Sequence, residues 1–148
     1  MMSRSAFRHA TEIAVRNYEI DWQGIVHNGN YLLYCEVGRI RYLQELGLPV
    51  SVETIQGDSR IVVVRNEIDY RSTARFGENL RVLTRISKIG TTSFTFEGLI
   101  EEVTTGRIIA ENISVHVWLD RTTGEPVQVP ENFRALIAGF EGKNLASR

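Results

Sequence analysis

One stretch of the sequence, residues 18–49, constrains the fold more than any other, because a short polar loop there leads directly into a long apolar helix. The loop, residues 21–29, carries a carboxylate, a histidine and two glycines. The predicted helix covers residues 31–46, and its first turn is apolar on every side, so we expect it to be buried. The residues expected to define its ends are Asn28 or Asn30 as the N-cap, Gly47 in the left-handed position after the last turn, and Pro49 as the stop.

The two faces of this helix can be predicted from a rotation of about 100° per residue. Tyr34, Arg41 and Glu45 share one side, which is the expected solvent face. Glu36 and Arg39 lie opposite, among leucines, and their spacing allows them to pair. Charges on the core side of a helix are costly unless they are paired or used. These two residues therefore indicate either a buried structural ion pair or a carboxylate held near a functional site.

Most of the remaining chain is predicted to form β-strands, because β-branched or alternating apolar residues recur in runs separated by turn residues. The predicted strands are residues 10–20, 60–70, 79–89, 91–103 and 107–119. Residues 51–57 are expected to form a short helical turn or loop, and residues 130–140 a helix that closes one end. In the last strand we expect an inward apolar face of Ile109, Ile113, Val115, Val117 and Leu119, and an opposite face of Asn112, Ser114, His116 and Trp118.

The order of these elements predicts an α+β fold. Short connections between the strands imply antiparallel neighbours, and the simplest packing is one curved antiparallel sheet around one long central helix. A chain of this length is expected to form a single domain over residues 1–148, with loose ends at residues 1–8 and 142–148. Apolar side chains on faces expected to be exposed favour a dimer or a larger assembly, and they are Leu83, Leu99, Ile108 and Trp118.

Composition excludes several classes of protein. The formal net charge is −1, so no excess of basic residues indicates a nucleic-acid partner. No apolar run approaches the ~20 residues of a membrane span, and the N-terminus lacks the apolar region of a secretory signal. Cys35 is the only cysteine, which favours a reduced, cytoplasmic chain. No metal-ligand spacing and no phosphate-binding glycine loop occur, so we expect neither a metal nor an organic cofactor.

The loop before the helix has the parts of a reaction site. The Asp21 carboxylate could attack an activated carbonyl or act as a general base for water. The N–H groups at the helix start could stabilise an oxyanion. By composition alone, however, Asp21 is more often a turn residue, and His27 could contact a substrate or be solvated. Arg75 and Lys88 either bind the phosphates of a nucleotide-bearing substrate or lie on solvated strand faces.

Two blocks of sequence resemble a known family. The first runs Tyr18-x-x-Asp21-x-x-Gly24-Ile25-Val26-x-Asn28-x-Asn30-Tyr31-x-x-Tyr34-x-Glu36-x-Gly38-Arg39, and the second runs from Tyr70 to Leu80. Together they resemble the hot-dog-fold acyl-CoA thioesterases, in the subgroup of 4-hydroxybenzoyl-CoA thioesterase and the Tol–Pal-cluster acyl-CoA thioesterase. The resemblance covers about residues 10–133.

The resemblance implies a hot-dog fold, assembly into a homodimer or homotetramer, and hydrolysis of an acyl-CoA to free acid and CoA without metal or organic cofactor. It makes Asp21 the catalytic carboxylate, the amide near Asn28 the oxyanion donor, and Glu36 a reserve catalytic residue. The expected substrate-binding residues around this site are Trp22, Gly24, His27 and Tyr31, to which the cationic strand region adds Arg75 and Lys88 as candidates for binding phosphate.

The chain departs from the family pattern at two places. Members of the Tol–Pal-cluster type usually place a tyrosine and then a histidine where this chain has His27 and Asn28, and a proline where it has Thr73. Because of the difference at His27 and Asn28, neither a catalytic histidine nor the preferred acyl group can be carried over from the family to this chain. Two other functions are compatible with the fold: a hydratase or dehydratase of acyl thioesters, which needs an acid/base pair usually involving histidine, and a non-enzymatic acyl-CoA binding module.

Overall fold

The computed structural model describes residues 2–48, 59–142 and 145 of the chain. In chain order the elements are η1 (Arg4–Ala6), β1 (His9–Ala14), η2 (Asn17–Glu19), α1 (Asn28–Glu45), β2 (Ser59–Tyr70), β3 (Asn79–Ile89), β4 (Ser93–Glu102), β5 (Ile108–Asp120) and α3 (Glu131–Glu141). The first predicted strand is too long, because β1 ends at Ala14 and a 3-10 turn follows. The turn or loop predicted over residues 51–57 lies outside the described residues.

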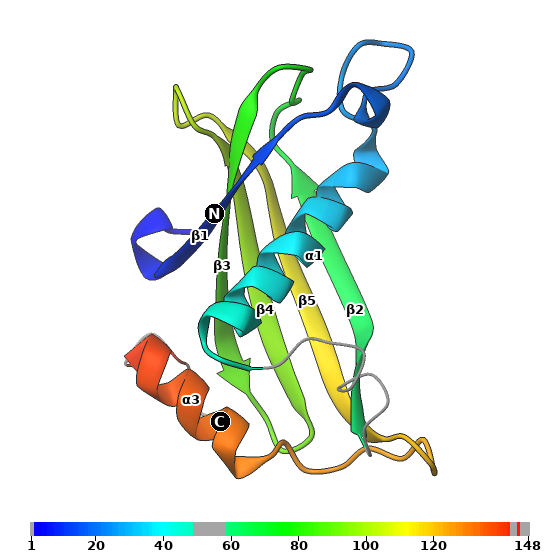
Figure 1. The fold of residues 1–148 in the computed structure, drawn as a ribbon, viewed down its shortest axis with the longest axis vertical. Coiled ribbons are helices and arrows are strands. Elements are labelled where there is room, and N and C mark those ends of the chain that lie inside the picture. Colours follow the sequence, from blue (N-terminus) through cyan, green and yellow to red (C-terminus); the bar gives the residue numbers. More distant parts are fainter. Residues whose placement is uncertain (1, 49–58, 143–144, 146–148) are drawn as a thin grey trace.

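The strands form one antiparallel sheet in the order β1-β3-β4-β5-β2. Helix α1 crosses one face of this sheet, and α3 lies near the end where α1 stops (Figure 1). Strands β1 and β2 form the two edges. The predicted α+β fold, a curved antiparallel sheet packed on one long helix, is therefore confirmed.

The helix approaches the sheet most closely at Gly38. A Cβ atom built on this residue would lie 2.6 Å from Oγ1 of Thr84 and 2.8 Å from Cγ1 of Val82, both on β3. Non-bonded heavy atoms of this kind are expected at about 3.5–4.0 Å. The absence of a side chain at Gly38 therefore sets the distance between α1 and β3.

The apolar core consists of two clusters along α1. The first lies under the N-terminal half of the helix, around Tyr31 and Cys35, and the second under its C-terminal end, around Tyr42. Burial raises the pKa of the Cys35 thiol to about 12, so this cysteine is a packing residue. The predicted helix end is confirmed, since Gly47 has a φ of +79° and the N–H of Leu48 donates to the carbonyl of Leu43 at 3.0 Å.

The structure corrects the predicted faces of α1. Tyr34, placed on the solvent side, is 1% exposed, and its hydroxyl donates to the carboxylate of Glu19 at 2.9 Å. Arg39 is buried as expected, but Glu36 is exposed. The described residues contain no ion pair between Glu36 and Arg39. Helical periodicity correctly predicted that Arg39 is buried, but it was wrong about Glu36 and Tyr34, which lie at the edges of the buried face. Tyr34 can be buried there because its hydroxyl reaches the Glu19 carboxylate.

The predicted orientation of β5 is wrong for the residues after Ala110, whereas Ile109 is buried in the core as predicted. Its polar residues Asn112, Ser114 and His116 face α1 and are at most 5% exposed, whereas Ile113 on the outer face is 37% exposed. The amide of Asn112 donates to Oδ1 of Asn66 and to the carbonyl of Glu67, at 2.6 and 2.8 Å. The alternation of polar and apolar residues predicted that Asn112 faces solvent, but hydrogen-bond partners on β2 allow it to be buried.

The N-terminal residues, predicted to be loose, lie across the outer face of the sheet. The Met2 N–H donates to Glu111 on β5, and Arg4 pairs with Glu101 on β4 at 2.9 Å. Leu83 and Leu99, which we expected to form an exposed apolar patch on this face, are 5% and 1% exposed. The C-terminal end predicted to be loose falls mostly outside the described residues.

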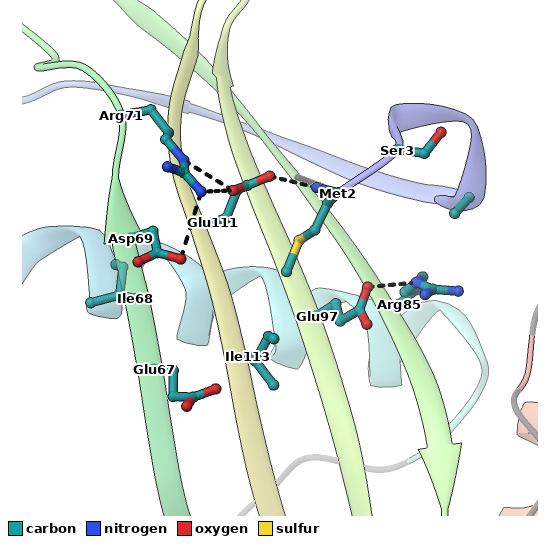
Figure 2. Close-up of a pocket in the computed structure, with 11 residues that line it drawn as sticks. Met2, Ser3, Glu67, Ile68, Asp69, Arg71, Arg85, Glu97, Glu111 and Ile113 are labelled. Carbon is teal, nitrogen blue, oxygen red and sulfur yellow. Dashed lines mark hydrogen bonds and ion pairs between the residues drawn. The ribbon is translucent and has the colours of Figure 1, made fainter.

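A hollow of about 790 Å³ opens on the same outer face. Figure 2 shows that charged side chains line it and that they face one another. Arg71 binds Glu111 at 2.8 Å, and Arg85 binds Glu97 at 3.0 Å. Because these charges are already paired, the outer hollow offers little to a charged ligand.

Helix α3 carries a buried acid. Glu141 is 0% exposed and accepts hydrogen bonds from the Tyr42 hydroxyl and, at 3.2 Å, from the N–H of Ile86, while its Oε1 has no partner among the described residues. Burial raises the pKa of this carboxyl, against the opposing effects of those hydrogen bonds and of Arg85 and Arg8. The acid connects α3 to both α1 and β3.

We predict that Gly38→Ala lowers the free energy of unfolding by about 1–3 kcal/mol, because the new methyl group pushes α1 away from β3. Gly139→Ala is the matched control, since a Cβ there meets nothing within 4 Å in another helix. That control should be neutral or stabilising by up to ~1 kcal/mol. Urea unfolding of both variants measures the difference, and equal effects would contradict the close approach.

We predict that Glu141 makes the protein less stable as the pH rises. A carboxyl with a raised pKa holds its proton more tightly in the folded chain, so its contribution is present at low pH and is lost as the pH rises through the folded pKa. The unfolding free energy of wild type minus that of Glu141→Gln should therefore fall between pH 4 and pH 8. Glu131→Gln, at an exposed position of the same helix, should show no such trend.

Candidate active site

The loop between η2 and α1 folds into a small hairpin that presents Asp21. Residues Ile20 and Val26 form a β-bridge, and Gly24 closes the turn with a φ of +81°. The Oδ1 atom of Asp21 accepts the N–H of Gln23 at 2.7 Å. Asp21 is thus a turn residue whose other carboxylate oxygen has no hydrogen-bond partner in the described part of the chain. The two interpretations of Asp21, turn residue and reactive carboxylate, are compatible.

A second segment holds this hairpin in place. Ile25 bridges to Arg75, and the Val26 N–H donates to the carbonyl of Ala74 at 2.9 Å. The N–H of Ala74 in turn donates to the Tyr31 hydroxyl on α1 at 3.0 Å. The loop after β2 therefore connects the hairpin to the central helix.

Glu19 is the residue that fixes the hairpin to the start of α1. Its carbonyl accepts the N–H of His27 at 2.9 Å and the side-chain amide of Asn30 at 2.8 Å. Its carboxylate accepts the Tyr34 hydroxyl, the Arg16 N–H and the Arg16 guanidinium. Burial acts to raise the pKa of Glu19, but these hydrogen bonds hold it below its ordinary value, so the side chain is ionised at neutral pH.

The start of α1 has one unused backbone donor. His27, and not Asn28 or Asn30 as predicted, is the N-cap, because its Nδ1 accepts the N–H of Gly29 at 3.1 Å. The N–H of Asn30 donates to the carbonyl of His27. Among the described residues the N–H of Asn28 has no acceptor. Free N–H groups at a helix start carry partial positive charge and attract anionic oxygen.

A cavity of about 700 Å³ joins these parts. It is lined by Asp21, Trp22, Gln23, Ile25, Val26, His27, Asn28, Tyr31, Tyr70, Arg71, Ser72 and Thr73. Five of the predicted site residues are in this set: Asp21, Trp22, His27, Asn28 and Tyr31. Gly24 shapes the turn beside it, and Arg75 lies at its edge through the bridge to Ile25.

Two predicted site residues are not brought to this cavity within one chain. Glu36 is exposed eight residues beyond Asn28, roughly 12 Å along the helix. Lys88 lies near the far end of β3, roughly 30 Å along the strand from Asn79. Neither lines the cavity that contains Asp21.

Sequence reasoning missed several residues of the site. Tyr70 lines the cavity, and its hydroxyl donates to the carbonyl of Asn28 at 3.3 Å. Ser72 and Thr73 also line the cavity, and Glu19 holds the hairpin against the start of α1. The second sequence block that resembles the family, residues 70–80, could have indicated that Tyr70, Ser72 and Thr73 line the cavity. No local sequence pattern indicated a role for Glu19.

The part of the chain that the structure describes contains no group of three or more His, Cys, Asp or Glu residues able to hold a metal ion. Within the same residues no helix has the length and apolar character needed to span a membrane. Asp21 and Asn28 both line the cavity, and a carboxylate with a backbone N–H donor is a combination that hydrolytic sites use.

Comparison with known proteins identifies the family. Residues 15–137 match the thioesterase-like superfamily. The chain belongs to this superfamily and is a thioester hydrolase. The chain is similar to the chloroplastic acyl-acyl carrier protein thioesterase ATL2 of Arabidopsis thaliana, with 30% identity over 93% of this chain and 72% of that one. It is also similar to the putative acyl-CoA thioesterase YneP of Bacillus subtilis, with 32% identity over 82% and 87%.

Solved structures agree with the fold. A thioesterase from Thermus thermophilus, complexed with coenzyme A and zinc, superposes with a TM-score of 0.79 at 31% identity, covering 93% of this chain and 96% of that one. A 1,4-dihydroxy-2-naphthoyl-CoA thioesterase from Synechocystis has a TM-score of 0.82 at 20% identity, covering 87% and 94%, which is a likeness of fold alone. The predicted hot-dog fold is confirmed.

We predict that Glu19→Gln lowers the free energy of unfolding by about 1–3 kcal/mol, because a neutral amide loses the ion pair and weakens the hydrogen bonds. It should also lower kcat by about tenfold or more, since the hairpin then moves relative to the helix start. Thiol release and urea unfolding measure the two effects. Glu12→Gln, an exposed acid on β1, is the control, and an equal response in both variants would contradict the role of Glu19.

Proposed function

We propose that the protein hydrolyses acyl-CoA thioesters to free acid and CoA, with Asp21 as the catalytic carboxylate and the N–H of Asn28 as the oxyanion donor. One observation carries this proposal. The unpartnered oxygen of Asp21 and the unused N–H of Asn28 belong to residues lining the same cavity. Such a site can receive a thioester carbonyl between an attacking group and a stabilising donor.

Two chemical roles are open to Asp21. As a general base it takes a proton from water while the hydroxide adds to the carbonyl carbon. As a nucleophile it forms a mixed anhydride and expels CoA thiolate, and water then cleaves the anhydride. Both routes consume one water and yield the acid and the thiol. In both, negative charge develops on the carbonyl oxygen, where the Asn28 N–H and the dipole of α1 stabilise it.

Three supports favour a CoA carrier. YneP is named a putative acyl-CoA thioesterase, and the Thermus protein binds coenzyme A. Arg75 lies beside the cavity, and a guanidinium group near the mouth is suited to phosphates. ATL2 is named an acyl-acyl carrier protein thioesterase, so acyl thioesters of both carriers should be assayed. Membership of the 4-hydroxybenzoyl-CoA and Tol–Pal-cluster subgroup stays a prediction that rests on the two sequence blocks.

Self-association into a homodimer or homotetramer also stays a prediction, and the surface supports it. Strand β2 is an open edge of the sheet, and unpaired edges favour pairing with another chain. Large apolar side chains are exposed on this strand, with Val63 at 48% and Val64 at 58%, and on α1, with Leu33 at 55%. A second copy there could bring Glu36 or Lys88 towards the cavity of its partner.

We predict that Asp21→Asn lowers kcat for acyl-CoA hydrolysis by about 10²–10⁴-fold. Asparagine keeps an oxygen for the Gln23 N–H, so the turn and the unfolding free energy should be preserved. Steady-state thiol release with several acyl-CoAs measures the effect, and Asp69→Asn, at an exposed acid of β2, is the control. Wild-type turnover by Asp21→Asn would exclude Asp21 from both chemical roles.

A further inference from the structure

A band of polar side chains is buried beneath the middle of α1. Arg39 of the helix is 9% exposed, and below it on β5 Asn112, Ser114 and His116 are 1%, 0% and 5% exposed. This band lies between the two apolar clusters, which reach α1 at Cys35 and at Tyr42. Buried polar groups cost free energy unless they are hydrogen-bonded, so each should have a partner.

All members of the band but Arg39 are well paired. Ser114 Oγ lies 2.9 Å from Nε2 of His116, and the Asn112 amide donates twice to β2. Arg39 has five N–H donors, but in the described part of the chain its hydrogen bond is a long one, 3.4 Å from Nη1 to Oδ1 of Asn112. No carboxylate of a described residue lies within ion-pair distance of it. Arg39 therefore has capacity for a further acceptor.

The band has an uncompensated positive charge. Burial, together with the nearby Arg39, lowers the pKa of His116 to about 4, so the imidazole is neutral at physiological pH. Burial lowers the pKa of Arg39 too, against the effects of Cys35 and the exposed Glu36, but an arginine stays protonated. A buried guanidinium without a carboxylate is suited to an incoming anion.

Arg39 lies within reach of a chain that starts in the Asp21 cavity. It is 11 residues beyond Asn28 on α1, roughly 16 Å along the axis, and helical side chains lean back toward the N-terminus. Tyr70 lines the cavity, and Asn66 lies on the same face of β2, roughly 13 Å further along the strand. Asn66 is exposed and bonds Asn112, the acceptor for Arg39. Measured along α1 and along β2, the polar band therefore lies at a distance from the cavity that an extended acyl chain can cover.

We propose that Arg39 binds an anionic group at the far end of the acyl chain, so that the preferred substrates are CoA monothioesters of dicarboxylic acids. The Arg39 guanidinium would hold the distal carboxylate, and Asn66 would donate to it from β2. A planar guanidinium can give two parallel hydrogen bonds to a carboxylate, whereas an alkyl end would leave the buried charge uncompensated. This inference rests on the proposed function.

Matched substrate pairs test it. For each chain length from hexanoyl to dodecanoyl, kcat/KM is measured for the simple acyl-CoA and for the monothioester of the dicarboxylic acid of the same length. At the best length, wild type should favour the dicarboxylic thioester by about tenfold or more. Arg39→Met should bring that ratio to near one, and Arg39→Lys should retain part of it. Arg41→Met, at an exposed arginine of the same helix, should leave the ratio unchanged.

Three results would overturn the inference. Equal kcat/KM for both members of every pair would show that the distal carboxylate is not recognised, with thioester hydrolysis itself intact. An unchanged preference in Arg39→Met, or a change in oligomeric state with no change in the ratio, would assign Arg39 to packing or to a subunit contact. Failure of wild type to release thiol from any acyl-CoA would reject the proposed function, and the inference with it.

Discussion

The close contact between Gly38 and β3 determines the position of everything that α1 carries. At 1.5 Å of rise per residue, the helix places its start, its polar middle and its end at fixed heights over the sheet once one point is set. The start meets the hairpin of Asp21, the middle covers the polar band, and the end meets α3 through Tyr42 and Glu141. The proposed catalytic site, the proposed specificity site and the contact with α3 are therefore all positioned by one helix.

The sheet below the helix has two different faces. The inner face contains apolar clusters interrupted by the polar band, while the outer face is dominated by paired charges beneath the N-terminal segment. Ionic contacts of partly exposed groups contribute little stability each, so the outer face chiefly orders the first residues of the chain. The inner face carries the free energy of folding, because its side chains are almost fully removed from water.

Sequence patterns correctly predicted those features of the fold that are determined by residues close together in the chain. The helix over residues 31–46 and its end at Gly47 follow from local rules, as do four of the strands. The sequence predicted that Asp21 and the start of the helix belong to one site, because they are close together in the chain. Patterns failed where a distant partner decides. Asn112 is buried because β2 accepts its amide hydrogens and Arg39 donates to its oxygen, and Tyr34 is buried because Glu19 accepts its hydroxyl. Glu19 itself could not be predicted, since its role exists only after the hairpin has folded.

The attachment of Glu19 at both ends of the hairpin has a consequence for how this site can change. Its carbonyl binds His27 and Asn30 on the far side of the turn, so the number of residues between these anchors is fixed by geometry. Trp22 and Gln23 at the tip are exposed and make few demands on the fold. The fold therefore tolerates other residues at the tip, whereas an inserted or deleted residue would separate the Asp21 carboxylate from the helix start and so remove the arrangement on which the proposed function depends.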